Sequence, residues 1–239
     1  EITIKELIET VPEKEVSVQG DQTRRIASVT WDYQKVTPNG LYFCVEDEEF
    51  QEAHVETTAL DYWKEAVAAG AVCLVAERGK INELPRDVTL VEVAHLNRAM
   101  ALMAKAFYRD PLAGMKVIGI TGTNGKTTTS QLIDSILIHA EHKTGVIGTI
   151  GIFSPSGIQE ASHLSNPMAT EVFAIADRMR SEKVDCLTME VTSHAGAFDR
   201  NYAIDFDVGV YTNLTQDHLD YHKTIESYKN CKLRHFQQL

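Results

Sequence analysis

The strongest chemical signal in the sequence is a glycine-rich segment with one lysine and a run of threonines. Residues 119–129 read Gly-Ile-Thr-Gly-Thr-Asn-Gly-Lys-Thr-Thr-Thr and continue a buried-type apolar run. Glycines let backbone N–H groups converge on phosphate oxygens, and the amino end of a following helix adds partial positive charge. In such a loop Lys126 reaches the β- and γ-phosphates and the Thr127 hydroxyl binds Mg²⁺. The segment therefore predicts a binding loop for a nucleoside triphosphate.

The glycine spacing of this segment departs from the usual pattern of such loops. The usual pattern has a glycine five residues before Gly125, where this chain has Ile120. The glycines here are Gly119 and Gly122. A glycine-rich turn with an incidental lysine is the alternative, and the strand–loop–helix setting favours phosphate binding.

An ATP-using site also needs an acidic residue at the end of a neighbouring strand. Residues 184–190 supply one, because Glu190 follows an apolar run. A glutamate at a strand end is, by itself, more often a solvated turn residue. In a chain that also has the phosphate-binding loop, a functional carboxylate is the favoured interpretation. The sequence has no Asn-Lys-x-Asp run of the kind that reads guanine, so ATP is favoured over GTP.

The elements that must position these groups alternate between strand and helix in the second half of the chain. Residues 115–120 form a continuous apolar strand typical of a parallel sheet, and residues 127–140 follow as a helix. A turn is expected at residues 154–157. The remaining predicted elements are strands at residues 144–150, 184–190 and 206–212 and helices at residues 170–181 and 224–238. This alternation predicts an α/β fold with a mostly parallel sheet.

The first half of the chain has shorter elements and ends at a breaker segment. We expect helices after Thr3 and at residues 61–69 and 96–108, and strands at residues 27–30, 41–45, 71–76 and 88–93. Arg-Asp-Pro-Leu-Ala-Gly at residues 109–114 ends the last helix. The sequence thus predicts two domains, a small N-terminal α/β domain at residues 1–110 and a P-loop domain at residues 115–239.

Composition excludes several classes of protein. The 239 residues include 23 Lys and Arg against 34 Asp and Glu, for a net charge of −11, which argues against nucleic-acid and anionic-membrane binding. No apolar run approaches the roughly 18 residues that span a bilayer, and no signal peptide is evident. The four cysteines form no Cys-x-x-Cys pair, so we expect reduced thiols in a cytoplasmic protein rather than a disulfide framework or a zinc site.

Three segments, taken together and in order, resemble the Mur ligase family. They are residues 119–129, Met-Glu-Val-Thr-Ser-His-Ala at residues 189–195, and Thr-Asn-Leu-Thr-Gln-Asp-His-Leu-Asp-Tyr-His at residues 212–222, continuing to Lys232. The last two are most similar to the MurE type. The resemblance is strong from about residue 115 onward and loose before it. It implies an ATP-dependent ligase of peptidoglycan precursor synthesis, which joins an amino acid to a UDP-N-acetylmuramoyl-dipeptide through an acyl phosphate.

The resemblance also implies roles for individual residues. Thr127 and Glu190 would hold one Mg²⁺, and His218 with a carboxylated Lys232 would help to hold a second. Asn213 and Asp217 would lie near the nucleotide or the metals. The implied catalytic residues are Lys126, His218 and Lys232, and the implied ATP-binding residues are Gly122, Thr123, Asn124, Gly125, Lys126, Thr127, Thr128 and Asn213.

Residues implied to bind the muramoyl substrate depart partly from the family pattern. Ser165-Asn166-Pro167 stands where the family has Thr-Thr-Pro, and Thr192 stands in its Ser-Ser-His element. Phe198 replaces a glutamine, whereas Arg200 remains and could pair with a carboxylate or phosphate through two hydrogen bonds. The predicted substrate-binding residues are Ser165, Asn166, Thr192 and Arg200.

The first domain departs further, at the elements that belong to the uridine-nucleotide site in relatives. Asp32-Tyr33-Gln34 stands in place of Asp-Ser-Arg, and Glu52-Ala53-His54 stands in place of Asp-Gly-His. Two alternatives therefore remain open beside the MurE-type reading. One is a related ligase that acts on a different carboxylate, and the other is a nucleotide-binding module without ligase chemistry, which the retained Lys126, Glu190 and Lys232 disfavour.

The histidines and the chain end give two further expectations. His218 and His222 have the spacing of a metal pair, but the glutamate of His-Glu-x-x-His is absent and the position after a strand end argues against a helix. His194 and the other histidines are expected to be ordinary polar or capping residues. Because the chain stops at Leu239, part-way through the expected central sheet, we expect residues 1–239 alone to lack ligase activity and to expose an apolar face.

Overall fold

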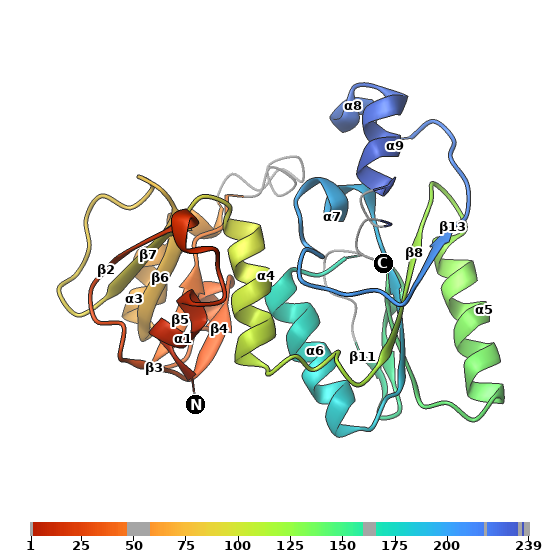
Figure 1. The fold of residues 1–239 in the computed structure, drawn as a ribbon, viewed down its shortest axis with the longest axis horizontal. Helices are drawn as coiled ribbons and strands as arrows, with labels where there is room; N and C mark the ends of the chain where they lie inside the picture. Colours follow the sequence, from red (N-terminus) through yellow and green to blue (C-terminus); the bar gives the residue numbers. More distant parts are fainter. Residues whose placement is uncertain (1, 47–57, 160–165, 218, 234–235, 237–239) are drawn as a thin grey trace. The chain divides into compact units, whose positions relative to one another are not determined.

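The computed structural model describes residues 2–46, 58–159, 166–217, 219–233 and 236, and the chain forms two compact units, residues 1–109 and 110–239 (Figure 1). Each unit has a mostly parallel sheet with helices packed against it, which confirms the predicted α/β class. Five residues with a predicted role or a family comparison above lie outside the described residues. They are Glu52, Ala53, His54, Ser165 and His218.

Unit 1 is built on a sheet with the strand order β2-β7-β6-β5-β4. These strands are β2 (Val16–Gln19), β4 (Ser28–Thr30), β5 (Gly40–Phe43), β6 (Ala71–Glu77) and β7 (Thr89–Val93). Strands β4 to β7 run parallel and β2 pairs antiparallel with β7. A separate antiparallel pair joins β1 (Ile2–Thr3) and β3 (Arg25–Ile26). The sequence did not predict β1, β2 or β3, because two to four residues at a sheet edge carry little apolar periodicity.

Helices of unit 1 follow local capping signals. Helix α1 (Ile4–Ile8) begins after Thr3, whose hydroxyl accepts from Glu6 N while the Glu6 carboxylate accepts from Thr3 N. The helix predicted at residues 61–69 is a 3₁₀ turn, η3 (Ala59–Tyr62), followed by α3 (Trp63–Ala68). Shorter 3₁₀ turns are η1 (Glu13–Glu15) and η2 (Tyr33–Lys35), and α4 (Leu96–Phe107) ends the unit.

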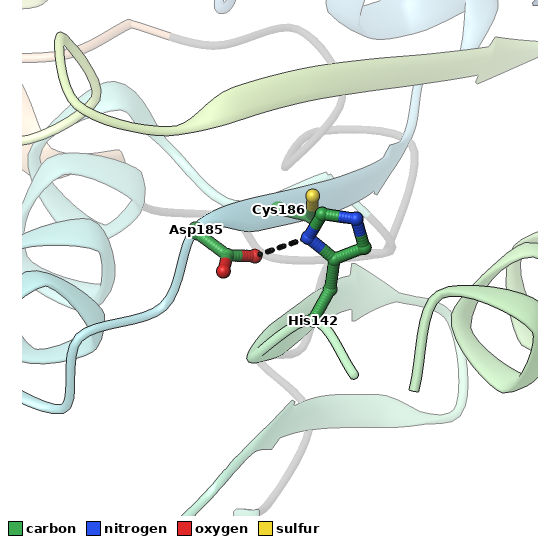
Figure 2. A group of neighbouring side chains, drawn as sticks. All are labelled: His142, Asp185 and Cys186. Atoms are coloured by element: carbon green, nitrogen blue, oxygen red, sulfur yellow. Dashed lines mark hydrogen bonds and ion pairs between the residues drawn. The ribbon is translucent and has the colours of Figure 1, made fainter. Parts of the chain in front are cut away.

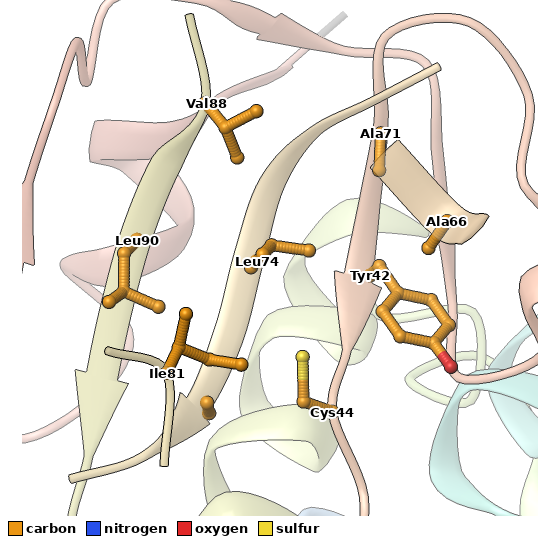
Figure 3. Close-up of a cluster of buried hydrophobic side chains, with 9 residues drawn as sticks. Tyr42, Cys44, Ala66, Ala71, Leu74, Ile81, Val88 and Leu90 are labelled. Carbon is orange, nitrogen blue, oxygen red and sulfur yellow. The ribbon is translucent and has the colours of Figure 1, made fainter. Parts of the chain in front are cut away.

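One face of this sheet packs into a hydrophobic cluster beneath α3 (Figure 3). Alternate residues of neighbouring strands point into it, and its members are Tyr42, Cys44, Ala66, Ala71, Leu74, Ala76, Ile81, Val88 and Leu90. The Tyr42 hydroxyl donates to the Ala59 carbonyl at 2.7 Å, so the ring is buried without losing its hydrogen bond. Burial raises the pKa of the Cys44 thiol to about 12.

Unit 2 has the strand order β11-β10-β9-β12-β8-β13 within its described residues. The strands are β8 (Lys116–Thr121), β9 (Thr144–Gly148), β10 (Gly151–Ser154), β11 (Gly157–Gln159), β12 (Cys186–Glu190) and β13 (Val208–Tyr211). Strands β9, β12, β8 and β13 run parallel, so their carboxyl ends meet at one edge. Strands β10 and β11 form a hairpin around the turn predicted at residues 154–157.

Two long helices lie on opposite faces of this sheet (Figure 1). Helix α5 (Lys126–His139) packs on β9, β12 and β8, and helix α6 (Ala169–Ser181) covers the other face. Helix α5 exposes Leu132, Ile136 and Ile138 to solvent. No helix within the described residues is both long enough and apolar enough to cross a membrane.

Three short helices lie near the carboxyl edge of the sheet: α7 (Ser193–Ala197), α8 (Leu219–His222) and α9 (Ile225–Leu233). The expectation of no helix before His222 was wrong, because α8 forms one turn that packs on α9. His222 and His194 lie 5.6 Å apart in a cluster of rings, and Thr192 caps α7. The expectation that His194 is an ordinary polar or capping residue stays a prediction, since the structure shows ring contacts for it without assigning a role.

Candidate functional site

The loop between β8 and α5 has the backbone geometry of a phosphate cradle. Gly122 has φ +142° and Gly125, the residue that precedes α5, has φ +85°. A side chain at Gly122 would put its Cβ 1.9 Å from the Thr212 Oγ1 atom, so only glycine fits there. The loop thus directs its backbone toward the amino end of α5, where unpaired N–H groups and the helix dipole favour an anion.

The segment that follows β13 holds this loop in place. Asn213 accepts from Asn124 N through Oδ1 at 3.1 Å and donates from Nδ2 to the Asn124 carbonyl at 3.0 Å. The Thr212 hydroxyl donates to the same carbonyl at 2.7 Å, and Thr123 exchanges hydrogen bonds with the Thr215 backbone. Asn213 therefore lies at the loop, where the sequence predicted it, and its contacts are with the loop backbone.

Two lysines from distant parts of the chain converge on one carbonyl oxygen of the loop. The Lys126 Nζ donates to the Gly122 carbonyl at 3.0 Å, and the Lys232 Nζ donates to the same oxygen at 2.8 Å. Burial lowers the pKa of Lys126, with partial compensation from Glu190 and Asp217. Burial and then the charge of Lys126 lower the pKa of Lys232 to about 8. The two amines form a compact cationic pair at the mouth of the loop.

The Glu190 carboxylate acts electrostatically on Lys126, the first lysine of this pair. Glu190 ends β12, beside the P-loop strand, and is 1% exposed. Its Oε2 accepts from the Thr149 hydroxyl at 2.9 Å and its Oε1 from Thr149 N at 3.2 Å. The Gly148 position leaves room for this carboxylate, because an added Cβ would lie 2.4 Å from Oε1. Asp217 acts electrostatically on both lysines.

Tyr228 links the second lysine to the loop. Its hydroxyl donates to Thr123 Oγ1 at 3.2 Å, and the Lys232 Nζ lies 4.5 Å from the centre of its ring. The ring also lies 5.2 Å from His222. Helix α9 approaches α7 closely, since a Cβ at Gly196 would lie 2.4 Å from the Cys231 carbonyl. Lys232, which is 2% exposed, is thus held by packing on three sides.

Three of the four predicted substrate-binding residues, Asn166, Thr192 and Arg200, lie in internal contacts, and the fourth, Ser165, lies outside the described residues. Asn166 is 1% exposed and donates from Nδ2 to Asn201 Oδ1 at 3.1 Å. The Thr192 hydroxyl accepts from Ala195 N at 3.1 Å and caps α7. The buried Arg200 guanidinium lies 5.5 Å from the centre of the Phe198 ring. No contact recorded for these side chains distinguishes binding from packing, so their role remains a prediction.

The structure adds residues that the sequence analysis missed. Thr149 orients Glu190, Thr212 and Thr215 brace the loop, and Tyr228 connects the loop to Lys232. A signal for two of them exists in the sequence. Thr149 follows a strand that ends at the same edge as Glu190, and Tyr228 precedes Lys232 by one helical turn.

Comparison with known proteins decides the family. The sequence profile of the Mur ligase middle domain matches residues 120–239, which is half of the chain. The chain belongs to the Mur ligase family. The P-loop, Glu190, Asn213 and Lys232 all lie within the matched residues. The match confirms the resemblance that the motifs indicated.

The curated relatives of this chain in the Mur ligase family are longer proteins. UDP-N-acetylmuramoyl-L-alanyl-D-glutamate--2,6-diaminopimelate ligase of Bacillus cereus is 41% identical over 214 residues, which cover 90% of this chain and 41% of that protein. The enzyme of the same name from Bacillus licheniformis is 37% identical over 223 residues, which cover 93% of this chain and 43% of that protein. The chain therefore spans less than half the length of these relatives.

Solved structures of Mur ligases share the fold. One, a UDP-N-acetylmuramoyl-L-alanyl-D-glutamate--2,6-diaminopimelate ligase, superposes with a TM-score of 0.76 at 21% identity and covers 99% of this chain and 45% of that one. MurF from Acinetobacter baumannii superposes with a TM-score of 0.63 at 18% identity, over 99% of this chain and 46% of that one. At these identities the likeness establishes the fold alone.

Proposed function

We propose that this chain carries the ATP site of a ligase that joins an amino acid to a UDP-N-acetylmuramoyl-dipeptide, as the names of the curated relatives indicate for those proteins. The observation that carries the proposal is the Lys126 amine on the Gly122 carbonyl at the amino end of α5, with the buried Glu190 carboxylate acting on that amine. A structural turn needs no such cation, whereas a triphosphate carries the negative charge that balances it.

The proposed ligation has two steps, formation of an acyl phosphate and its attack by the amine. A substrate carboxylate oxygen bonds to the γ-phosphorus of ATP as the bond to the β–γ bridging oxygen breaks, and ADP leaves. The amino acid's amine then bonds to the acyl carbon, the bond from that carbon to the phosphate oxygen breaks, and a proton is released. Lys126 and the N–H groups at the start of α5 hold the phosphates and offset their charge. The chain thus contributes positioning and electrostatics rather than a nucleophile.

The oxygen donors at this edge suit Mg²⁺, which the family uses. The Glu190 carboxylate is buried and oriented by Thr149, and Thr127 is in the first turn of α5. These two residues would hold one ion, and Lys232 in its carboxylated form, with His218, would help to hold another. Bound Mg²⁺ neutralises charge on the transferring phosphoryl group.

Lys232 is the residue whose chemistry is most specific to this proposal. The ammonium group first loses a proton, and the neutral amine then bonds to the carbon of CO₂ and releases a second proton, so the side chain changes from a cation to an anion. Burial and the neighbouring Lys126 lower the pKa of this amine to about 8, which increases its neutral fraction near physiological pH. The exposed Lys229, one helical turn earlier, is the matched control.

The test uses ¹³C-labelled bicarbonate and ¹³C NMR on the chain with Mg²⁺ present. We expect one carbamate signal that is absent in Lys232→Ala and retained in Lys229→Ala. A signal that survives Lys232→Ala would contradict the carboxylation. The ligase assignment is tested separately, by release of ADP from ATP in the complete gene product with UDP-linked muramoyl dipeptide and a panel of amino acids.

A second candidate is a related ligase that acts on a different carboxylate. It is favoured by the Tyr33 ring, which stacks on Tyr62 with ring centres 4.4 Å apart, at the position where the family resemblance leads us to expect an Asp-Ser-Arg element. ADP release with another acid, but not with the UDP-linked dipeptide, would select this candidate.

A further inference from the structure

Three potential metal ligands of unit 2 meet at the end of the sheet opposite the P-loop. His142 lies between α5 and β9, Asp185 directly precedes β12, and Cys186 is the first residue of β12 (Figure 2). One ligand atom from each residue lies within 4.8 Å of the other two. The His142 Nδ1 and Asp185 Oδ1 atoms are 3.2 Å apart. That separation is about the distance between two ligands of one tetrahedral ion with metal–ligand distances near 2.0–2.2 Å.

Backbone hydrogen bonds fix the two chain segments that carry these donors. The Lys143 carbonyl, directly after His142, accepts from Asp185 N at 2.8 Å and from Cys186 N at 3.3 Å. On the other side, Lys116 N donates to the Asp185 carbonyl at 2.8 Å. The Cα positions of the donors are therefore set by the sheet, and only side-chain rotations remain to be adjusted on metal binding.

Two charged groups beside the thiol pair with each other. Asp207 and Lys116 both act on Cys186 and lie 2.7 Å apart, and Asp207 also accepts from Val117 N. Glu141 and Lys143 flank His142 in the sequence. The Cys186 side chain is buried, whereas His142 and Asp185 are exposed, so an ion would keep one open side toward solvent.

We propose that His142, Asp185 and Cys186 form a site for a thiophilic divalent cation of the zinc class, with water in the fourth position. A nitrogen, an oxygen and a sulfur donor suit Zn²⁺ or Co²⁺ and do not suit Mg²⁺, which takes oxygen ligands. The bound ion would tie the α5–β9 connection to the start of β12. The site lies at the amino ends of the parallel strands, so it is independent of the nucleotide site.

Metal binding at this site exchanges a proton for the ion. The Cys186 S–H bond breaks as the metal–sulfur bond forms, and the proton passes to the buffer.

Cobalt spectroscopy on the whole chain tests the proposal. Co²⁺ should give a thiolate-to-metal charge-transfer band, and Zn²⁺ should displace it. Cys186→Ser and His142→Ala should each abolish the band and weaken Zn²⁺ binding, measured by calorimetry, by at least about tenfold. His139→Ala removes another exposed histidine nearby in sequence and should leave both measurements unchanged.

Three outcomes would overturn the site. The first is an absence of any thiolate band, with Zn²⁺ binding unaffected by Cys186→Ser, as expected if His142 and Asp185 form an ordinary ion pair. The second is a band that persists in Cys186→Ser and disappears in Cys231→Ser. The third is a band in a variant whose circular dichroism shows that unit 2 has unfolded, which would assign it to denatured thiols.

Discussion

The two units carry polar groups at the carboxyl ends of parallel strands, and these groups are used differently. In unit 2 the groups converge on a loop, where Lys126 and Lys232 share the Gly122 carbonyl. In unit 1 the residues after β4 bond mainly to one another. The Asp32 carboxylate accepts from Gln34 N at 3.0 Å, and the Gln34 Nε2 donates to the Tyr33 hydroxyl at 3.3 Å.

The difference separates phosphate chemistry from substrate recognition. A phosphate cradle needs backbone N–H groups, glycines and lysines in one short segment, and unit 2 retains that segment. Recognition of a nucleotide sugar depends on individual side chains, and the positions that the family resemblance implies for it in unit 1 hold a stacked Tyr33 and a Gln34 that bonds to it. We therefore expect strong ATP binding in unit 2 and weak UDP binding in unit 1.

Among the substitutions considered, Lys126→Ala should have the largest effect on ATP binding and turnover. The change removes a cation from the loop, and each charge-assisted phosphate contact contributes about 1.5–3 kcal/mol. We expect ATP affinity to fall about 10–150-fold by calorimetry, and turnover of the complete gene product to fall by about 10²–10³-fold or more. Lys229→Ala, an exposed lysine on α9, is the control. Equal turnover in Lys126→Ala and the parent would contradict the assignment of the ATP site to this loop of unit 2.

Gly122→Ala should disrupt the loop through sterics rather than charge. Its Cβ would lie 1.9 Å from Thr212 Oγ1, and φ is +142°. We expect a loss of about 3 kcal/mol or more in the free energy of unfolding, measured with urea. Gly157→Ala has φ +114° and no atom within 4 Å of the added Cβ, so it isolates the backbone strain and should cost only about 1–2 kcal/mol.

The pH dependence of stability should report the buried Lys232. Its amine has a pKa of about 8 in the folded chain and about 10.4 when unfolded. Between these values the unfolded chain binds a proton that the folded chain has released, so the free energy of unfolding rises with pH in that window. Lys232→Met, in CO₂-free buffer, should lack a rise of about 2 kcal/mol between pH 7 and 9.5 that the parent and Lys229→Met show. If the free energy of unfolding of Lys232→Met rose with pH as much as that of the parent, the lowered pKa of Lys232 would be contradicted.

Restoring the family residues in unit 1 should have the smallest effect. The double substitution Tyr33→Ser and Gln34→Arg removes the stack on Tyr62 and adds a guanidinium for the diphosphate. We expect UDP affinity to rise about tenfold, equivalent to about 1.4 kcal/mol, while ATP affinity stays unchanged. Tight UDP binding by the unaltered chain would show that other groups of unit 1 replace the missing contacts.

The sequence predicted the local part of the site better than its long-range part. The loop, Glu190 and the α/β class follow from a contiguous motif and from apolar runs. The sharing of one carbonyl by Lys126 and Lys232 did not follow, because it depends on how α9 packs beside α7 across Gly196. The same limit applied to His222, whose ring contacts that of His194, 28 positions earlier in the sequence. His142 and Cys186 are 44 positions apart, so their meeting also required the fold.

Hydrogen exchange measured by mass spectrometry, with and without Mg²⁺ and ATP, tests the central claim most directly. The account predicts slower exchange in peptides that cover residues 119–129 and 212–217, and no change in residues 28–43 of unit 1. Lys126→Ala should remove the protection at matched ATP concentration. Protection confined to unit 1, or none at residues 119–129 when calorimetry shows ATP bound, would contradict it.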